Sequence, residues 1–237
     1  RFGVVDKLQQ TLANSLGATE TTLLRLTAGY AMLDNGGKKI TPTFIDRVQD
    51  RYGKTLFRAD QRACNGCNAG AWNDQPPPSV PDTRAQIGDP VSAYQMVSMM
   101  EGVVQRGTGA RIAELRRSIA GKTGTTNESL DTWFVGFTAD LAVGVFVGFD
   151  HLATLGKKEQ GASVAVPIFK DFMVEALKDK LDVPFRVPPG VSLVRVNHDT
   201  GQLARAGDRV VILEAFRAGS GPGESTTLMG MGADEGA

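Results

Sequence analysis

Three closely spaced runs of apolar and β-branched residues, at positions 119–126, 132–138 and 141–149, constrain the fold of this chain most strongly. A parallel pair of strands would need a crossover of about a dozen residues or more, and the links here are far shorter. The runs therefore predict neighbouring antiparallel strands of one sheet. A helix is expected next at positions 166–181, with Pro167 in its first turn, long enough to cover one face of that sheet.

The first run contains a polar sequence, Lys122-Thr123-Gly124-Thr125. Successive side chains of a strand point to opposite faces, so Thr123 and Thr125 are expected on one face and Lys122 and Gly124 on the other. For Lys122 to act beside the threonines, either the strand must twist or the long side chain must bend around. Asn127 comes next, either as a polar residue at the rim of a cleft or as a turn residue.

Apolar residues at helical spacing predict a helix near the beginning of the chain, at positions 19–35. Thr19 or Thr21 is the expected N-terminal cap. Asn35 and the two glycines that follow it are expected to end the helix by supplying left-handed backbone positions.

A second helix is predicted from Asp89 and Pro90, which stand in the order expected of a cap and an opening residue. The sequence Arg106-Gly107-Thr108-Gly109 is interpreted as its C-terminal cap and turn rather than as a phosphate-binding loop, because no lysine follows at the required spacing. Three methionines of this helix are expected to fill gaps in the core rather than to line a binding surface: Met96, Met99 and Met100.

Between these helices the sequence predicts a hairpin, with strands at 43–48 and 54–57 and a turn that contains Gly53. Positions 58–88 are expected to form a long loop, either a mobile flap or an insertion. Cys64 and Cys67 lie in this loop. A disulfide is favoured over half of a zinc site, since no second cysteine pair or histidine lies near enough in sequence to complete a metal site.

The C-terminal part changes character after Pro184. Apolar runs at 191–196 and 209–216, with a turn at 199–201, predict a small β extension over 185–218. From position 219 onward, glycine, serine, threonine and acidic residues predict a disordered tail, 219–237. The main domain is expected to occupy positions 1–184.

Composition excludes several classes of protein. The formal net charge is +0, so no basic field indicates a nucleic-acid partner. No stretch approaches the roughly 18 apolar residues of a membrane span. His151 and His198 have no acidic and serine partners in view, so a serine–histidine–aspartate triad is not expected, and the sequence gives no sign of a metal or a cofactor.

Several segments together resemble the transpeptidase domain of class A, bifunctional penicillin-binding proteins. The lysine-threonine-glycine element at 122–124 is a motif of serine β-lactamases and penicillin-binding proteins. The resemblance covers roughly residues 1–215 and is carried by the following segments as well: 16–17, 21–37, 106–109, 131–137, 145–150 and 165–172.

The resemblance implies an α+β fold, an antiparallel sheet flanked by helices, as an incomplete domain of the penicillin-recognising serine hydrolase type with a small C-terminal β extension. It also implies a D,D-transpeptidase that cross-links peptidoglycan stem peptides through an acyl-serine, with D-Ala-D-Ala stem peptides and β-lactams as ligands. Lys122 and Thr125 are the implied catalytic residues. Thr123, Gly124, Thr125 and Asn127 are the implied substrate-binding residues.

The chain departs from the family pattern in two motifs. No serine stands three positions before a lysine, and none stands two positions before an asparagine, so the serine-x-x-lysine and serine-x-asparagine motifs are absent. The sequence is therefore expected to be a C-terminal fragment, inactive alone, of a longer protein that also carries a glycosyltransferase domain. The resemblance implies that this longer protein is anchored in the inner membrane, with the present portion in the periplasm.

Two alternatives stay open. A D-alanyl carboxypeptidase or a β-lactamase on the same fold would keep the strand and hydrolyse its substrate instead of transferring it. A non-catalytic binding or structural module would use the same surface without chemistry.

Overall fold

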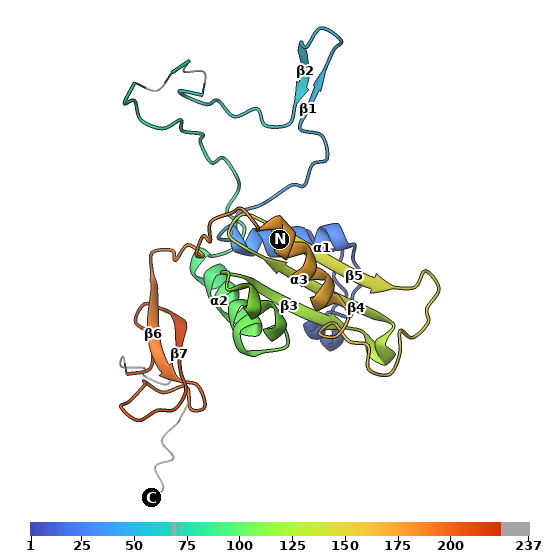
Figure 1. Ribbon diagram of the computed structural model, residues 1–237, viewed down its shortest axis with the longest axis vertical. Coiled ribbons are helices and arrows are strands. Elements are labelled where there is room, and N and C mark those ends of the chain that lie inside the picture. The colour runs from blue at the N-terminus through green and yellow to red at the C-terminus, as the bar shows by residue number, and fades with distance from the viewer. Residues whose placement is uncertain (68–69, 72, 224–237) are drawn as a thin grey trace, which may run out of the picture.

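The fold is α+β and is centred on a three-stranded antiparallel sheet with strand order β3-β4-β5 (Figure 1). The computed structural model describes residues 1–67, 70–71 and 73–223. The strands are β3 (Ala120–Thr125), β4 (Asp131–Phe137) and β5 (Ala142–Gly148). The prediction of three neighbouring antiparallel strands is confirmed, because each pairs in continuous register with the next.

One face of the sheet packs against α3 (Ala165–Ala176). Phe134 of β4 and Phe169 of α3 meet edge to face, with ring centroids 4.7 Å apart. Around them lies a core that also includes Val166 and Met173 of α3 and Ile119. The helix begins at Ala165, one residue before the predicted start, and ends at Ala176, five residues before the predicted end at 181.

The opposite face packs against α1 (Leu23–Asp34) and α2 (Pro90–Arg106). A second hydrophobic core lies between this face and the two helices. Phe137 of β4 is fully buried there and contacts Tyr30 of α1 edge to face at 6.4 Å. Val97 and Met100 of α2 pack in the same cluster. Both faces of the sheet are thus covered by helices, and β3 lies beside α2 (Figure 1).

The ends of the first two helices follow from local sequence. The Asp89 carboxylate accepts a hydrogen bond from the Ser92 backbone N–H, so the predicted cap of α2 is confirmed. The predicted caps of α1 are wrong, because Thr22 holds that position and accepts from the Arg25 backbone N–H. Gly36 and Gly37 follow α1 with positive φ angles, as predicted, but the prediction is wrong for Asn35, which caps the helix with φ −79°.

The prediction for the methionines of α2 is wrong for two of the three. Met100 is 5 % exposed and belongs to the core, but Met96 and Met99 are 43 % and 53 % exposed. These two side chains lie on the surface of a helix whose buried stripe is formed by other positions.

A long extension, residues 38–88, projects from the body of the molecule (Figure 1). Its hairpin consists of β1 (Arg47–Gln49) and β2 (Thr55–Arg58), with Gly53 at φ +81° in the turn, so the predicted hairpin is confirmed with a shorter first strand. Every residue of both strands is exposed. At its base the extension is held by a bridge between Lys38 and Gln86.

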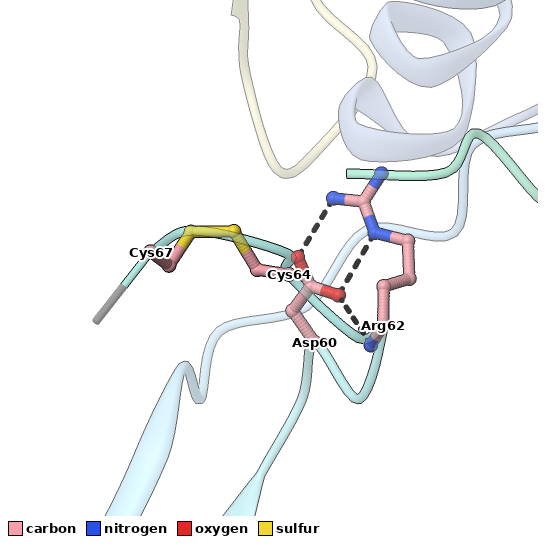
Figure 2. The surroundings of a disulfide bond; sticks show 4 residues. All are labelled: Asp60, Arg62, Cys64 and Cys67. Atoms are coloured by element: carbon pink, nitrogen blue, oxygen red, sulfur yellow. Dashed lines mark hydrogen bonds and ion pairs between the residues drawn. A yellow bond between two sulfur atoms is a disulfide. The ribbon is translucent and has the colours of Figure 1, made fainter. Parts of the chain in front are cut away.

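Cys64 and Cys67 form a disulfide within the extension, so the favoured prediction for this pair is confirmed. Figure 2 shows the bond beside Asp60 and Arg62, which form a bidentate ion pair at 2.7 and 2.9 Å. Next to the disulfide, an isolated β-bridge between Asn65 and Ser79 joins the two limbs of the extension, the one that leads away from the body and the one that returns to it.

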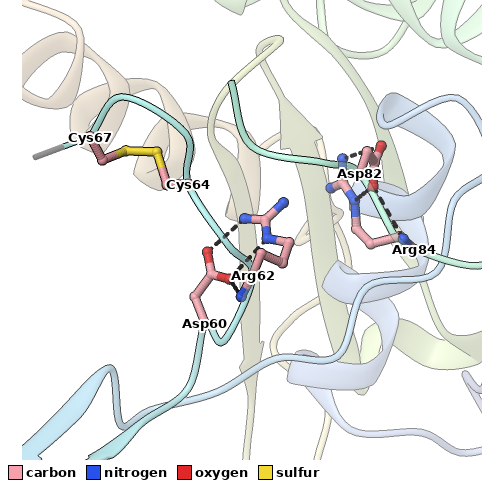
Figure 3. A network of polar contacts seen from close by, with 6 residues as sticks. All are labelled: Asp60, Arg62, Cys64, Cys67, Asp82 and Arg84. Atoms are coloured by element: carbon pink, nitrogen blue, oxygen red, sulfur yellow. Dashed lines mark hydrogen bonds and ion pairs between the residues drawn. A yellow bond between two sulfur atoms is a disulfide. The ribbon is translucent and has the colours of Figure 1, made fainter. Parts of the chain in front are cut away.

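The two limbs carry matching pairs, each an aspartate followed two residues later by an arginine (Figure 3). Asp60 pairs with Arg62, and Asp82 pairs with Arg84 at 2.8 Å. The hydrogen bonds from the arginine side chain hold the pKa of each aspartate far below its usual range. Both pairs are local and solvent-accessible, so their contribution to stability is small.

The C-terminal strands β6 (Val191–Asn197) and β7 (Val211–Arg217) form a separate two-stranded antiparallel sheet, as predicted. Two ion pairs join this sheet to α2 and its cap, Arg106–Glu214 at 2.8 Å and Arg217–Asp89 at 2.6 Å. The domain boundaries at 184 and 218 remain a prediction. The predicted disordered tail falls largely on residues 224–237, which lie outside the described residues.

Candidate active site

The candidate site is the second half of β3, the edge strand of the sheet. In the described part of the chain, β3 pairs with β4 and with no other strand. The strand begins in the core, where Ala120 and Gly121 are buried, and reaches the surface at Lys122, where the side chain is exposed. The free edge therefore presents backbone groups and polar side chains together, which is the arrangement that an extended peptide needs to add as a further strand.

The register settles which face each side chain occupies. Thr123 pairs with Phe134, and Phe134 packs on α3, so Thr123 and Thr125 lie on the α3 face. Lys122 and Gly124 lie on the opposite face, as the alternation predicts. The ammonium of Lys122 nevertheless returns to the edge, because Nζ lies 3.0 Å from the Thr123 carbonyl oxygen and 3.4 Å from Thr123 Oγ1. Of the two routes expected for Lys122, the structure shows the bent side chain.

Thr108 brings a further hydroxyl to the same place. Its Oγ1 lies 2.9 Å from Thr123 Oγ1, although the two residues belong to different elements. Thr108 follows the end of α2, which packs along β3. The sequence predicted a helix cap and turn here and contributed the segment to the family resemblance, but it gave no sign that Thr108 contacts Thr123.

Thr125 is held by a contact with the segment that precedes α3. The backbone N–H of Gly161 donates to Thr125 Oγ1 at 3.0 Å. Gly161 is buried and lies just before α3, which places the segment before that helix over the end of β3. No sequence signal marked Gly161, because its role depends on backbone approach rather than on side-chain chemistry.

Close packing against β4 explains why two positions of β3 are glycines. A Cβ at Gly124 would lie 3.2 Å from Trp133 Cβ, which leaves little room for a side chain. A Cβ at Gly121 would lie 2.6 Å from the Phe134 ring and 2.8 Å from the Val135 oxygen. Neither position accepts a larger residue without movement of the sheet.

Asn127 lies in the turn after β3, at the start of the short 3-10 helix η3 (Asn127–Ser129). Its side chain is exposed, and its role as a substrate contact remains a prediction. An open cavity of about 490 Å³ adjoins this turn and is lined by Glu128, Ser129, Thr154 and Lys157.

The arrangement can bind an anion that belongs to an extended chain. Lys122 supplies a positive charge with no carboxylate within 4 Å among the described residues. Thr123 and Thr125 supply hydroxyl donors. Hydrogen bonds from an ammonium or a hydroxyl to an anionic oxygen are stronger than hydrogen bonds between neutral groups. Within residues 1–67, 70–71 and 73–223, no three histidine, cysteine or acidic side chains group as metal ligands do.

None of the helices in the described part of the chain has the length and apolar character needed to cross a membrane.

The chain is similar to known proteins over most of its length. Residues 4–174 match the family described as the penicillin binding protein transpeptidase domain. Penicillin-binding protein 1A of Rickettsia bellii is 43 % identical over 219 residues, which are 92 % of this chain and 27 % of that protein. The chain thus spans about a quarter of the length of this relative.

Solved structures show the same similarity. The crystal structure of penicillin-binding protein 1A from Haemophilus influenzae is 34 % identical with a TM-score of 0.77, over 93 % of this chain and 36 % of that one. The PonA1 protein of Mycobacterium tuberculosis in complex with penicillin V is 25 % identical with a TM-score of 0.55, over 74 % of this chain and 43 % of that one.

Proposed function

The chain belongs to the penicillin-binding protein transpeptidase family, and from this premise we propose that it forms one wall of the active site of a serine-type D-Ala-D-Ala transpeptidase. The substrate is the stem peptide of peptidoglycan, and the product is a cross-link between two stem peptides. One observation carries the proposal: the free edge of β3 presents the Lys122 ammonium and the hydroxyls of Thr123 and Thr125 around one end of the strand.

The edge of β3 binds the donor peptide. The peptide lies alongside β3 as an added strand, and Gly124 allows it to approach closely. Its terminal carboxylate accepts hydrogen bonds from the hydroxyls of Thr123 and Thr125 and is attracted by Lys122. The Thr125 hydroxyl is well placed for this, since its oxygen already accepts from the Gly161 N–H and its own proton is donated to no other group in the described part of the chain.

Acyl transfer then proceeds on a serine that this chain does not supply. The serine oxygen attacks the carbonyl carbon of the bond between the two D-alanines, the C–N bond breaks, and D-alanine leaves with the proton of the serine. The amine of a second stem peptide attacks the carbonyl carbon of the resulting ester, the C–O bond to the serine breaks, and the proton lost by the amine returns to the serine oxygen. Lys122 favours proton loss from a neighbouring hydroxyl, and the backbone N–H of Thr125 is one of two donors to the oxyanion.

The absence of the serine-x-x-lysine and serine-x-asparagine motifs assigns the nucleophile to another part of the complete gene product. That product is a longer protein with a glycosyltransferase domain, anchored in the inner membrane, with this portion in the periplasm. β-Lactams are its inhibitors, and the similarity to PonA1, solved with penicillin V, supports this assignment. The 237-residue chain by itself is inactive.

A labelling experiment tests the proposal. The complete gene product and the 237-residue chain are each incubated with a fluorescent penicillin and examined by denaturing electrophoresis. The complete product is expected to be labelled stoichiometrically, and an unlabelled penicillin added first should prevent the labelling. The isolated chain is expected to remain unlabelled. Absence of label on the complete product would refute the transpeptidase assignment, and label on the isolated chain would refute the external nucleophile.

A further inference from the structure

The turn after α2 has the sequence Gly107-Thr108-Gly109. Because neither glycine has a side chain, the backbone of the turn can pack closely against the last turn of the helix. Their N–H groups converge on one acceptor, the Val103 carbonyl oxygen, each at 3.1 Å. A Cβ at Gly107 would lie 3.0 Å from Val103 Cα, and one at Gly109 would lie 3.3 Å from the Val103 oxygen. Thr108, between the glycines, is therefore held in one place.

Thr108 lies beside the second half of β3, which forms the candidate site. Thr108 is exposed, and its only hydrogen bond from the side chain to a described residue is the 2.9 Å contact with Thr123 Oγ1. This contact joins the turn after α2 to the residue of β3 that is proposed to bind the substrate carboxylate.

The hydrogen bonds of the Thr123 hydroxyl indicate the effect of its contact with Thr108. A hydroxyl has one proton to donate and two lone pairs that accept. The Lys122 ammonium can only donate, so at 3.4 Å it occupies one lone pair of Thr123 Oγ1. If Thr108 donates into the second lone pair, the proton of Thr123 has no acceptor among the described residues and is directed outward.

We propose that Thr108 is a positioning residue that, together with Lys122, fills both lone pairs of Thr123 and so aims the Thr123 proton at the substrate carboxylate. This inference rests on the proposed function, in which Thr123 binds that carboxylate. Thr108 itself does not touch the substrate. Its effect passes through Thr123 alone, and this makes the inference separable from a structural role of the turn.

The test uses the complete gene product and the second-order rate constant for acylation by a fluorescent penicillin. Thr108→Val removes the hydroxyl and keeps the shape, and we expect it to lower the rate constant about fivefold to tenfold, as loss of one hydrogen bond would. Thr108→Ser keeps the hydroxyl and should stay within about twofold of the unaltered protein. Thr41→Val changes an exposed threonine of the extension and should have no effect.

Two further measurements separate positioning from structure. On a Thr123→Val background, Thr108→Val should cause no additional loss, because the residue through which it acts is gone. With the methyl ester of the same penicillin, which lacks the carboxylate, Thr108→Val should change the rate by less than about twofold. A loss that persisted in either case, or an equal loss in Thr108→Ser, would overturn the inference.

The outcomes also distinguish the inference from the proposed function. If the unaltered complete product takes no label, the proposed function fails and the inference fails with it. If the unaltered product is labelled and Thr108→Val is labelled as fast, the inference alone fails.

Discussion

Gly161 and Thr125, which are 36 positions apart in the sequence, are joined by a hydrogen bond from the Gly161 N–H to the Thr125 hydroxyl oxygen at 3.0 Å. A Cβ built on Gly161 would lie 2.7 Å from the carbonyl oxygens of both Gly124 and Trp133. The segment before α3 thus rests on the backbone of β3 and β4, and only a glycine permits the approach.

Gly161→Ala is therefore expected to destabilise the chain by about 1–3 kcal/mol, because the added methyl group must displace one of two sheet backbones. The free energy of unfolding by urea, followed by circular dichroism, measures the effect. Gly70→Ala is the matched control, since a Cβ there meets no described atom within 4 Å. Equal stability of the two variants would show that the segment moves away without cost.

Lys122→Met is expected to separate function from folding. The side chain is exposed, so the free energy of unfolding should change by no more than about 0.5 kcal/mol. Penicillin acylation of the complete gene product should fall by about 100-fold, in the range found when one group that stabilises developing charge is removed. Lys178→Met, at another exposed lysine, should leave both quantities unchanged. Acylation that survived Lys122→Met would remove the ammonium from the proposed mechanism.

Reduction of the disulfide is expected to act on the extension alone. A cross-link that closes so short a loop, with a sequence separation of 3, stabilises by at most about 2 kcal/mol, and neither cysteine contributes to the core. We expect faster proteolytic cleavage between residues 58 and 88 after treatment with a dithiol, with an unchanged midpoint for unfolding of the core. Limited proteolysis with mass spectrometry measures the first, and near-ultraviolet circular dichroism the second.

The paired variant Cys64→Ser/Cys67→Ser should reproduce the reduced pattern without any reductant. A drop in the midpoint for the core, or cleavage that ignored the reductant, would contradict this prediction.

The stability of the chain is expected to fall as the pH rises from about 4 to about 7, because of Asp34. Burial, and then the like charge of Asp140, raise the pKa of Asp34 to about 7. The folded state therefore holds a proton that the unfolded state has lost between about pH 4 and pH 7. The stability linked to this proton is present at lower pH and is lost as the pH rises through 7. Solvent screening of this half-buried group limits the loss to about 1–2 kcal/mol.

Asp34→Asn tests this directly. The variant should be more stable than the parent at pH 8 by about 1–2 kcal/mol and close to it at about pH 4, where the parent holds the proton in both states, as measured by urea unfolding at both values. Asp179→Asn, at an exposed aspartate, is the control. A parent and an Asp34 variant that lose stability in parallel would refute the assignment.

The fold was predictable wherever short-range chemistry decides the structure. The β strands, the hairpin and the start of α2 follow from alternation, a turn glycine and the Asp89–Pro90 pair, and all are present. The misplaced cap of α1 shows the limit of this reasoning, since three threonines within four residues can compete for the cap, at positions 19, 21 and 22, and the structure uses Thr22. Met96 and Met99 were misplaced because residue type does not show which stripe of a helix meets the sheet.

The candidate site was predictable only along the strand itself. Alternation correctly divides Lys122 from Thr123, but the sequence left open how the ammonium reaches the threonines, because this depends on side-chain rotamers at the edge. The contacts of Thr108 and Gly161 could not be foreseen. Both arise from packing between segments that are far apart in the chain.

The division of β3 into a buried first half and an exposed second half has a consequence for how this protein can vary. Substitutions at Ala120 or Gly121 disturb the interior, and selection will remove them through poor folding before any ligand is encountered. One residue further along, the Lys122 side chain is exposed, so a change there is expected to leave the architecture intact and to alter the proposed recognition of the substrate. Changes in ligand preference that keep the fold are therefore expected at Lys122 and not at the buried positions that precede it.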